Sequence, residues 1–369
     1  MSPSKHNTNS PNPGTSEPKV LLEDLTADLL WPSLLRAPAM AFSPSRWFLG
    51  IIAAFMLVLV TSIYSAAFSP AESPLTTQAA YPGFQSIPYA LSTLNPALII
   101  NTLATGAQHH IALIAQDPWT SLALYTPILL IMGIFGFAIT RSASIEFALG
   151  RQTDTTASLN AALRTIRQIA LTTLGPLLAV AILAAIVMLL GPILGLPVVN
   201  ILAAILYFIG LLLSILIVCI LTMHLLTLPL SISALAIEGT DGFDALQRAY
   251  AYLIAKPIRL AIYATILIIL GTTITTIVAI LANWSIATTD ALASTLTNDA
   301  GRRVLTGDSE MAATEPLANR IIFLAQSTLQ LIVIGYTLSL LFCSSTMAYL
   351  CIRRVSDGQD ITEIWDPTS

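Results

Sequence analysis

The sequence predicts an all-α, polytopic integral membrane protein with six transmembrane helices and two cytoplasmic interfacial amphipathic helices. Of its 369 residues, 55% are hydrophobic and 10% are charged, and its mean hydropathy is +0.79. A soluble domain carries about 25% charged residues because its surface faces water. Six apolar runs are long enough for a helix to cross a bilayer, which takes about 20 residues. Basic residues gather on alternate connections between these runs, a pattern that orients multipass proteins.

Residues 1–46 precede the first apolar run and are predicted to form a cytoplasmic segment. Residues 1–18 are rich in Ser, Pro, Asn and Thr, so we expect them to be disordered. Leucines recur on one helical face between residues 20 and 30, which predicts a short amphipathic helix ended by Pro32. The polar leader is long for a cleaved secretory signal, so the first run is interpreted as a retained helix.

The six predicted spans occupy the apolar runs and are joined by loops and one tight hairpin. Their ranges are 47–67, 119–140, 169–190, 198–226, 257–282 and 327–352. The third and fourth spans are separated by residues 191–197, GPILGLP, whose glycines and prolines predict a hairpin rather than a continuing helix. A single helix over 169–226 would be far too long for one crossing.

The distribution of basic residues predicts which ends face the cytoplasm. All but three of the 16 Lys and Arg residues precede the first span, follow the sixth, or lie between the second and third or the fourth and fifth. The exceptions, Arg302, Arg303 and Arg320, lie in an acidic stretch on the opposite side. The positive-inside rule then places both termini, including the tail 353–369, in the cytoplasm. The predicted location is the bacterial cytoplasmic membrane.

Two long loops, 68–118 and 285–326, are predicted on the outer side. Residues 97–115 of the first loop are apolar enough for a helix on the outer leaflet, but His109 and His110 argue against a seventh span. These histidines have no third ligand at a suitable spacing, so they do not predict a metal site.

A charged loop, residues 228–260, joins the fourth and fifth spans, and a fainter copy lies at 141–171. With an offset of 87 residues, Thr153 and Asp154 align with Thr240 and Asp241. In each copy a residue that can cap a helix precedes apolar residues at helical spacing, which predicts amphipathic helices at 154–168 and 241–254. The same offset predicts a tandem repeat of 119–190 and 206–282. Parallel repeats occur in transporters that hold substrate between the halves, and they also arise by simple duplication.

Candidate functional residues are few and lie near the cytoplasmic boundary. The spans carry no charged residue near mid-bilayer, where one would indicate function. The candidates are His224, Glu146, Glu238, Asp241, Asp244 and Arg248. Paired carboxylates can bind a cation or act as acid and base, whereas the neighbouring arginines favour ordinary ion pairs and phosphate contacts. His224 is expected to bond to a backbone carbonyl or a lipid headgroup.

The sequence contains no P-loop, dinucleotide fingerprint or nucleophile elbow, so it predicts no catalytic residue and no cofactor. Cys219, Cys343 and Cys351 lie in or beside apolar runs and form neither a disulfide framework nor a metal pattern. No basic patch supports nucleic-acid binding. The expected partners are therefore membrane lipids and other membrane proteins.

The motifs AIEG (236–239), DALQR (244–248) and KP (256–257) resemble loops of uncharacterised multipass bacterial membrane proteins. Together with the closing segment 349–358, they are similar to the membrane domain that some glycerophosphodiester phosphodiesterases carry beside their catalytic domain. The resemblance covers residues 228–260 and the tail, and it implies a multipass membrane domain. No phosphodiesterase domain is present, so the resemblance does not imply that activity.

The sequence leaves three functional hypotheses. The first is a non-enzymatic, membrane-organising or accessory subunit that acts through protein partners. The second is a small-solute transporter or channel, with a water-accessible cavity lined by His224 and the threonine-rich turn 272–276. The third is a lipid-active enzyme at the inner leaflet, in which Glu238, Asp241 and Asp244 converge on a cleft.

Overall fold

The computed structural model describes residues 31–68, 118–196, 199–307 and 314–365. All regular elements in these ranges are α-helices, and six helical spans are long and apolar enough to cross a membrane. The span helices are α4 (Pro44–Phe68), α8 (Pro118–Leu149), α10 (Ile166–Met188), α12 (Val199–Glu238), α14 (Pro257–Thr295) and α16 (Glu315–Asp357). The predicted all-α architecture with six spans is confirmed. The chain is a multipass membrane protein.

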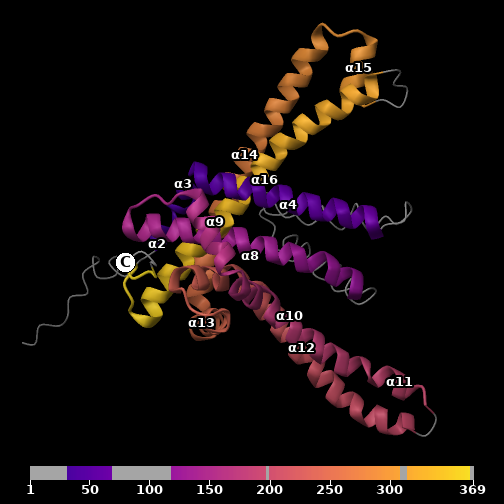
Figure 1. Ribbon diagram of the computed structural model, residues 1–369, viewed down its shortest axis with the longest axis vertical. Helices are drawn as coiled ribbons and strands as arrows, with labels where there is room; N and C mark the ends of the chain where they lie inside the picture. Colours follow the sequence, from indigo (N-terminus) through magenta and orange to yellow (C-terminus); the bar gives the residue numbers. More distant parts are fainter. Residues whose placement is uncertain (1–30, 69–117, 197–198, 308–313, 366–369) are drawn as a thin grey trace, which may run out of the picture.

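Short helices gather at one end of the molecule (Figure 1). They are α2 (Trp31–Leu34), α3 (Ala37–Ala41), α9 (Thr155–Arg164) and α13 (Gly242–Ala255). At this end α4, α10 and α14 begin and α8, α12 and α16 end, and we call it the charged end. The α10–α12 and α14–α16 pairs diverge from it as separate hairpins, with α11 (Leu190–Leu194) and α15 (Asp299–Thr306) near their far turns.

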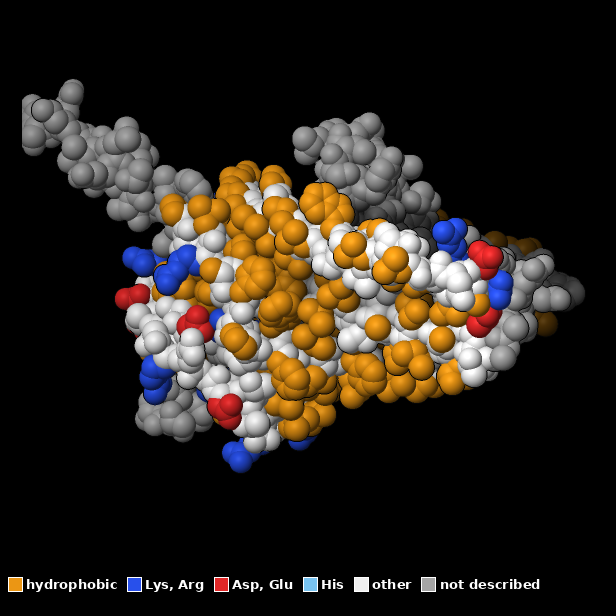
Figure 2. Space-filling view, turned by 90° about the horizontal axis from the view of Figure 1, so that it is seen from above, with side chains coloured by type: hydrophobic (Ala, Val, Ile, Leu, Met, Phe, Trp, Pro, Cys, Tyr) orange, Lys and Arg blue, Asp and Glu red, His pale blue; other side chains and the backbone are white. Residues whose placement is uncertain are grey.

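Side chains of different kinds separate along the molecule. Figure 2 shows Lys, Arg, Asp and Glu side chains toward one end, a broad hydrophobic band beyond them, and a second small group of charges at the opposite end. A bilayer presents two polar faces on either side of a hydrocarbon layer about 30 Å thick. The arrangement of the surface therefore matches that of a protein embedded in lipid.

Helix α16 is the central span. Within its most apolar 18-residue stretch 67% is buried by protein, compared with 6% for α14 and 0% for α10. The half of α16 nearer the charged end carries small polar residues that hydrogen-bond to other helices. The hydroxyl of Ser345, for example, lies 2.8 Å from the Ser233 hydroxyl of α12. Small and hydroxyl-bearing residues let membrane helices approach closely and bond across the interface. The outer spans present most of their apolar surface to their surroundings.

Helix α4 crosses α16 in backbone contact. A Cβ added to Gly50 would lie 2.0 Å from the Gly335 carbonyl oxygen, so neither helix can carry a larger side chain there without moving. The indole of Trp47 donates to the Ile332 carbonyl at 3.0 Å, beside this crossing. The close approach positions the start of α4, and with it Arg46, against the core of the charged end.

The structure corrects the prediction that residues 228–260 form a charged loop. Residues 228–238 are the last turns of α12, which continues through Pro229 and ends at Glu238. Ile232, Leu235 and Ile237 of this segment are buried. Protein, rather than lipid or water, surrounds these turns, because α8, α13 and α16 pack against α12.

Three further boundaries differ from prediction. The helix predicted at 154–168 ends at Arg164, and α10 begins at Ile166 after a break at Thr165. Residues 190–194 form α11, although the glycines and prolines of the hairpin 191–197 were predicted not to continue a helix. Pro192 lies in the first turn of α11, where no intrahelical N–H bond is needed. Much of the predicted loop 285–326 is helical, in α14, α15 and α16. The predictions for residues 1–30 and 97–115, including His109 and His110, lie outside the described residues.

The order span, short helix, span occurs twice, as α8–α9–α10 and as α12–α13–α14. The two short helices begin at Thr155 and Gly242, 87 residues apart, and each follows an aspartate with extended backbone, Asp154 and Asp241. This order is the one that the predicted tandem repeat requires. The duplication itself stays an inference from the sequence.

Candidate functional site

Glu238 is the centre of an ion-paired cluster at the charged end. Its Oε1 accepts a hydrogen bond from Arg353 Nη1 at 2.8 Å and another from the Tyr349 hydroxyl at 3.0 Å. Its Oε2 lies 3.9 Å from Nη1 of Arg248. Because the side chain of Arg353 is 1% exposed, Glu238 supplies the negative charge that makes this buried cation tolerable. The cluster joins the ends of α12 and α16 to α13.

A segment after α16, residues 358–365, folds back over the end of α12, and we call it the strap. Arg353 Nη2 donates to the carbonyls of Asp360 and Glu363 at 2.8 and 2.7 Å. The Trp365 backbone N–H donates to the Ile237 carbonyl at 2.8 Å, which satisfies one of the last carbonyls of α12. Arg353 therefore anchors the strap as well as the ion pair.

The indole ring of Trp365 packs against Gly239 and Arg141. Gly239 ends α12 with a φ of +64°, and a Cβ there would lie 2.3 Å from the indole ring. The guanidinium of Arg141 lies 4.7 Å from the centroid of the indole, close enough for a cation–π interaction. Glycine is required here for two reasons: it adopts the left-handed conformation readily, and it leaves room for the ring.

The carboxylates of Asp241 and Asp244 have local structural roles. Asp241 is the N-cap of α13, where its Oδ1 accepts from the backbone N–H groups of Phe243 and Asp244 at 3.0 and 2.8 Å. Asp244 accepts from Arg248 Nε at 3.1 Å, one turn along the same helix. Of the sequence candidates, Glu238, Asp244 and Arg248 are therefore brought together, with Arg248 between the two carboxylates.

Glu146 belongs to a separate ion pair, which joins α8 to α4. Its Oε2 lies 2.9 Å from Nη1 of Arg46, a side chain that is 1% exposed. Arg46 Nε also donates to the Met40 carbonyl of α3 at 2.8 Å. The pair fixes the entry of the first span, since one arginine bonds to both neighbouring elements.

His224 is buried between helices of the two predicted repeats. Its Nε2 donates to the Thr173 carbonyl of α10 at 3.0 Å, and its Nδ1 lies 3.5 Å from the Tyr250 hydroxyl of α13. A carbonyl partner was the expected structural role of this histidine. Thr273, in the threonine-rich turn, donates to its own helix at the Ile269 carbonyl, so its hydroxyl is already used within α14.

Tyr252 of α13 contacts the end of α16 beside the ion-paired cluster. Its hydroxyl donates to the carboxylate of Asp357 at the end of α16, and its ring lies 5.7 Å from that of Tyr349. Burial, and then the hydrogen bond to the Asp357 carboxylate, raise the pKa of Tyr252 above its usual value of 10. The hydroxyl is therefore protonated at neutral pH and acts as a donor.

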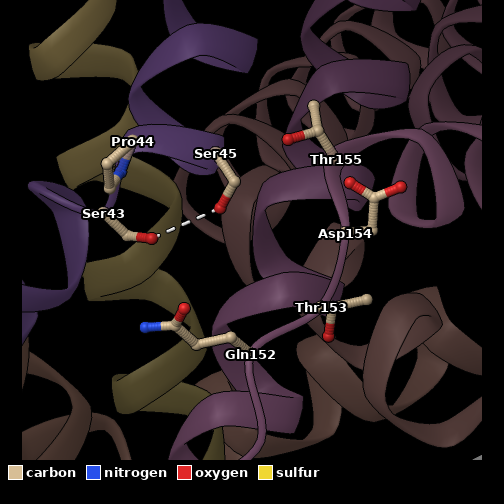
Figure 3. Close-up of a pocket in the computed structure, with 7 residues that line it drawn as sticks. All are labelled: Ser43, Pro44, Ser45, Gln152, Thr153, Asp154 and Thr155. Carbon is tan, nitrogen blue, oxygen red and sulfur yellow. Dashed lines mark hydrogen bonds between the residues drawn. The ribbon is translucent and has the colours of Figure 1, made fainter.

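A hollow of about 330 Å³ lies between the start of α4 and the connection from α8 to α9 (Figure 3). It is lined by Ser43, Pro44, Ser45, Gln152, Thr153, Asp154 and Thr155. The hydroxyls of Ser43 and Ser45 lie 3.3 Å apart and bond to each other. None of the six sequence candidates lines this hollow, so it does not unite them into a site.

The candidate residues take part in contacts between helices or within one helix. Each one bonds to a neighbouring helix, caps a helix or pairs with an arginine. Within the described ranges no group of three His, Cys, Asp or Glu side chains is placed to hold a metal ion. Arg353, Arg141 and Trp365 make central contacts of the charged end and were not among the candidates. The sequence offered two signals for these residues: arginines at the ends of apolar runs, and a tryptophan in a polar tail.

The fold and the site define a class, a multipass membrane protein whose charged end is fixed by buried ion pairs. Comparisons with protein-family models, with curated proteins and with solved structures find no match. The resemblance to multipass bacterial membrane proteins, and to a domain found beside phosphodiesterases, stays a prediction from its short motifs.

Proposed function

We propose that the protein is a non-enzymatic organising or accessory subunit of the bacterial cytoplasmic membrane, with its charged end and both termini in the cytoplasm. One observation carries the proposal: the residues that looked most suited to chemistry are used to join helices. Glu238 binds Arg353, Glu146 binds Arg46, and His224 bonds to a backbone carbonyl. A catalytic group must instead be free to contact a substrate.

The distribution of charge supports the proposed orientation. The described basic residues of the charged end outnumber those of the far end, where Arg302, Arg303 and Arg320 lie among acidic residues. Cytoplasmic loops of multipass proteins carry an excess of Lys and Arg. The charged end is therefore proposed to face the cytoplasm.

The diverging hairpins support a role in binding other membrane proteins. Ile182 on α10 is 57% exposed and Phe208 on α12 is 65% exposed, in apolar stretches of which 0% and 6% are buried within this chain. Surfaces of this kind must be covered by lipid or by helices of other proteins. A rigid charged end with separated spans suits a subunit that holds partner helices between its hairpins.

Photo-crosslinking in native membranes tests the proposal. Benzoylphenylalanine is introduced at Ile182 or Phe208 on the spans, and at Arg302 in the far polar turn as a control. We expect the span positions, but not the control, to yield a defined adduct with another membrane protein. If the span positions yield lipid adducts alone, the proposed role is wrong.

The two alternatives receive less support from the described residues. A transport pathway was expected to be lined by His224, but this side chain is 4% exposed and bonded to Thr173. A lipid-active site was expected to gather Glu238, Asp241 and Asp244 on a cleft. Instead, Glu238 pairs with Arg353, Asp241 caps α13 and Asp244 pairs with Arg248.

A further inference from the structure

Two junctions between helices at the charged end carry the same kinds of side chain. Each lies where a short amphipathic helix turns into a span, and each combines two apolar with two basic side chains. Corner 1, between α9 and α10, contains Leu163, Arg164, Ile166 and Arg167. Corner 2, between α13 and α14, contains Ile254, Lys256, Ile258 and Arg259. Each corner lies where the short helix meets the second span in its half of the predicted repeat.

The apolar side chains of both corners are exposed. Leu163 and Ile166 are 49% and 44% exposed, and Ile254 and Ile258 are 69% and 75% exposed. The same helices bury their other faces, because Ala162 of α9 and Tyr252 of α13 belong to the protein core. The exposed apolar groups are therefore available to a neighbour outside the chain.

The four cations of the corners differ from three arginines of this end that are held by carboxylates. Arg46, Arg248 and Arg353 pair with carboxylates. All four corner cations are exposed, and no carboxylate in the described part of the chain forms an ion pair with them. Each corner thus presents two positive charges that an anionic ligand would complement.

The position of the corners identifies the anion. The apolar spans of α10 and α14 begin at the corners, which places the corners where the bilayer hydrocarbon starts. Long cationic side chains there reach the phosphate level, while neighbouring apolar side chains enter the acyl region. Anionic phospholipids offer both the charge and the acyl chains at this depth.

The two corners are separate sites. The start of α13 is held beside corner 1, because the Gly242 N–H donates to Gln168 Oε1 at 2.9 Å and the Thr172 hydroxyl donates to the Gly242 carbonyl at 3.1 Å. Helix α13 has 14 residues, so at 1.5 Å per residue its other end, at corner 2, lies about 21 Å away. One phosphodiester headgroup cannot contact both corners.

We propose that each corner binds the headgroup of one anionic phospholipid, so that one protein molecule holds two. The proposal adds a lipid partner to the proposed function and rests on it in one respect, that the charged end faces the anionic leaflet. The lipids fix the depth and rotation of α10 and α14, the two spans that begin at the corners.

Native mass spectrometry of the full chain in detergent micelles tests the proposal. Phosphatidylglycerol and phosphatidylcholine with the same acyl chains are titrated separately. We expect two tightly bound phosphatidylglycerol molecules and much weaker phosphatidylcholine binding. With about 1 kcal/mol per cation near an anionic surface, removing both cations of one corner weakens that site about thirtyfold.

Charge-removing variants assign the sites. Arg164→Gln with Arg167→Gln should weaken one of the two tight sites by this factor, and Lys256→Gln with Arg259→Gln should weaken the other. The matched control, Arg302→Gln with Arg320→Gln, removes the same charge at the far end and should keep both. Circular dichroism confirms that the variants, changed at exposed positions, remain folded.

Equal binding of the two lipids, or two tight sites retained in a corner variant, would overturn the proposal. A micelle has no sides and holds no partner protein, so this result depends on neither orientation nor partner binding. Failure of the crosslinking experiment would refute the proposed function alone. Failure of the lipid titration would refute lipid binding at the corners alone.

Discussion

Replacing Glu238 with glutamine tests whether the ion pair with Arg353 stabilises the charged end. The substitution keeps the shape of the side chain and one oxygen acceptor but removes the negative charge. Arg353 would then be left 1% exposed without its carboxylate partner at 2.8 Å. It would retain its bonds to the strap carbonyls of Asp360 and Glu363.

The magnitude follows from the burial of both partners. Breaking a buried ion pair by removing one charge costs about 3–5 kcal/mol, because the other charge stays uncompensated. Glutamine still accepts a hydrogen bond, and Glu238 is 13% exposed, so we expect the lower limit, about 3 kcal/mol. The comparison variant is Asp244→Asn, which removes a carboxylate from an i,i+4 pair whose side chains are 34% and 38% exposed. That change should cost about 0.3–0.5 kcal/mol.

Unfolding by sodium dodecyl sulfate in mixed micelles, followed by circular dichroism, measures both variants on the full chain. We expect Glu238→Gln to shift the midpoint to clearly lower detergent fraction and Asp244→Asn to leave it almost unchanged. Equal, small losses in the two variants would refute the reasoning, because the buried arginine would then not depend on its carboxylate.

Three further outcomes are expected. Gly239→Ala should cost about 1–3 kcal/mol and expose the strap to protease, because it combines a positive φ with a clash against Trp365. Gly150→Ala, at φ +66° with open space around it, should cost only the backbone part, about 1–2 kcal/mol, and leave protease sensitivity unchanged. Gly50→Ala should cost at least about 1–3 kcal/mol in the same unfolding assay, because the added Cβ would overlap the α16 backbone. The raised pKa of Tyr252 means that the folded state holds this proton to higher pH than the unfolded state does. The contribution of this group to stability is therefore complete below about pH 10 and is lost as the pH rises above it, and Tyr252→Phe should remove that part of the fall in an alkaline unfolding series.

Hydropathy and charge distribution predicted the fold class because both are properties of long stretches of sequence. The predicted start of the fifth span at Pro257 coincides with the start of α14. The end of the fourth span was placed at Leu226, twelve residues before α12 ends. Residues 228–238 are mainly apolar and are buried mostly by protein rather than lipid. The length that a span needs therefore did not show where the helix ends.

The candidate site was predictable where its contacts are local. The cap by Asp241 and the pair of Asp244 with Arg248 follow from spacings of two to four residues. The bond from Arg353 to Glu238 joins residues 115 apart, and no periodicity connects them. The contacts of Trp365 with Gly239 and Arg141 could not be predicted either, because the fold brings these three distant segments together.

The proposed orientation, with both interfacial helices on the cytoplasmic side, is tested most directly by labelling with a membrane-impermeant maleimide. Single cysteines are placed at the exposed positions Gln152, before α9, Gln247, on α13, and Arg302, in the far turn, after the native cysteines are replaced. In right-side-out bacterial spheroplasts the account predicts labelling of Arg302→Cys alone, with Gln152→Cys and Gln247→Cys labelled only after lysis. Labelling of Gln152→Cys or Gln247→Cys before lysis would contradict it.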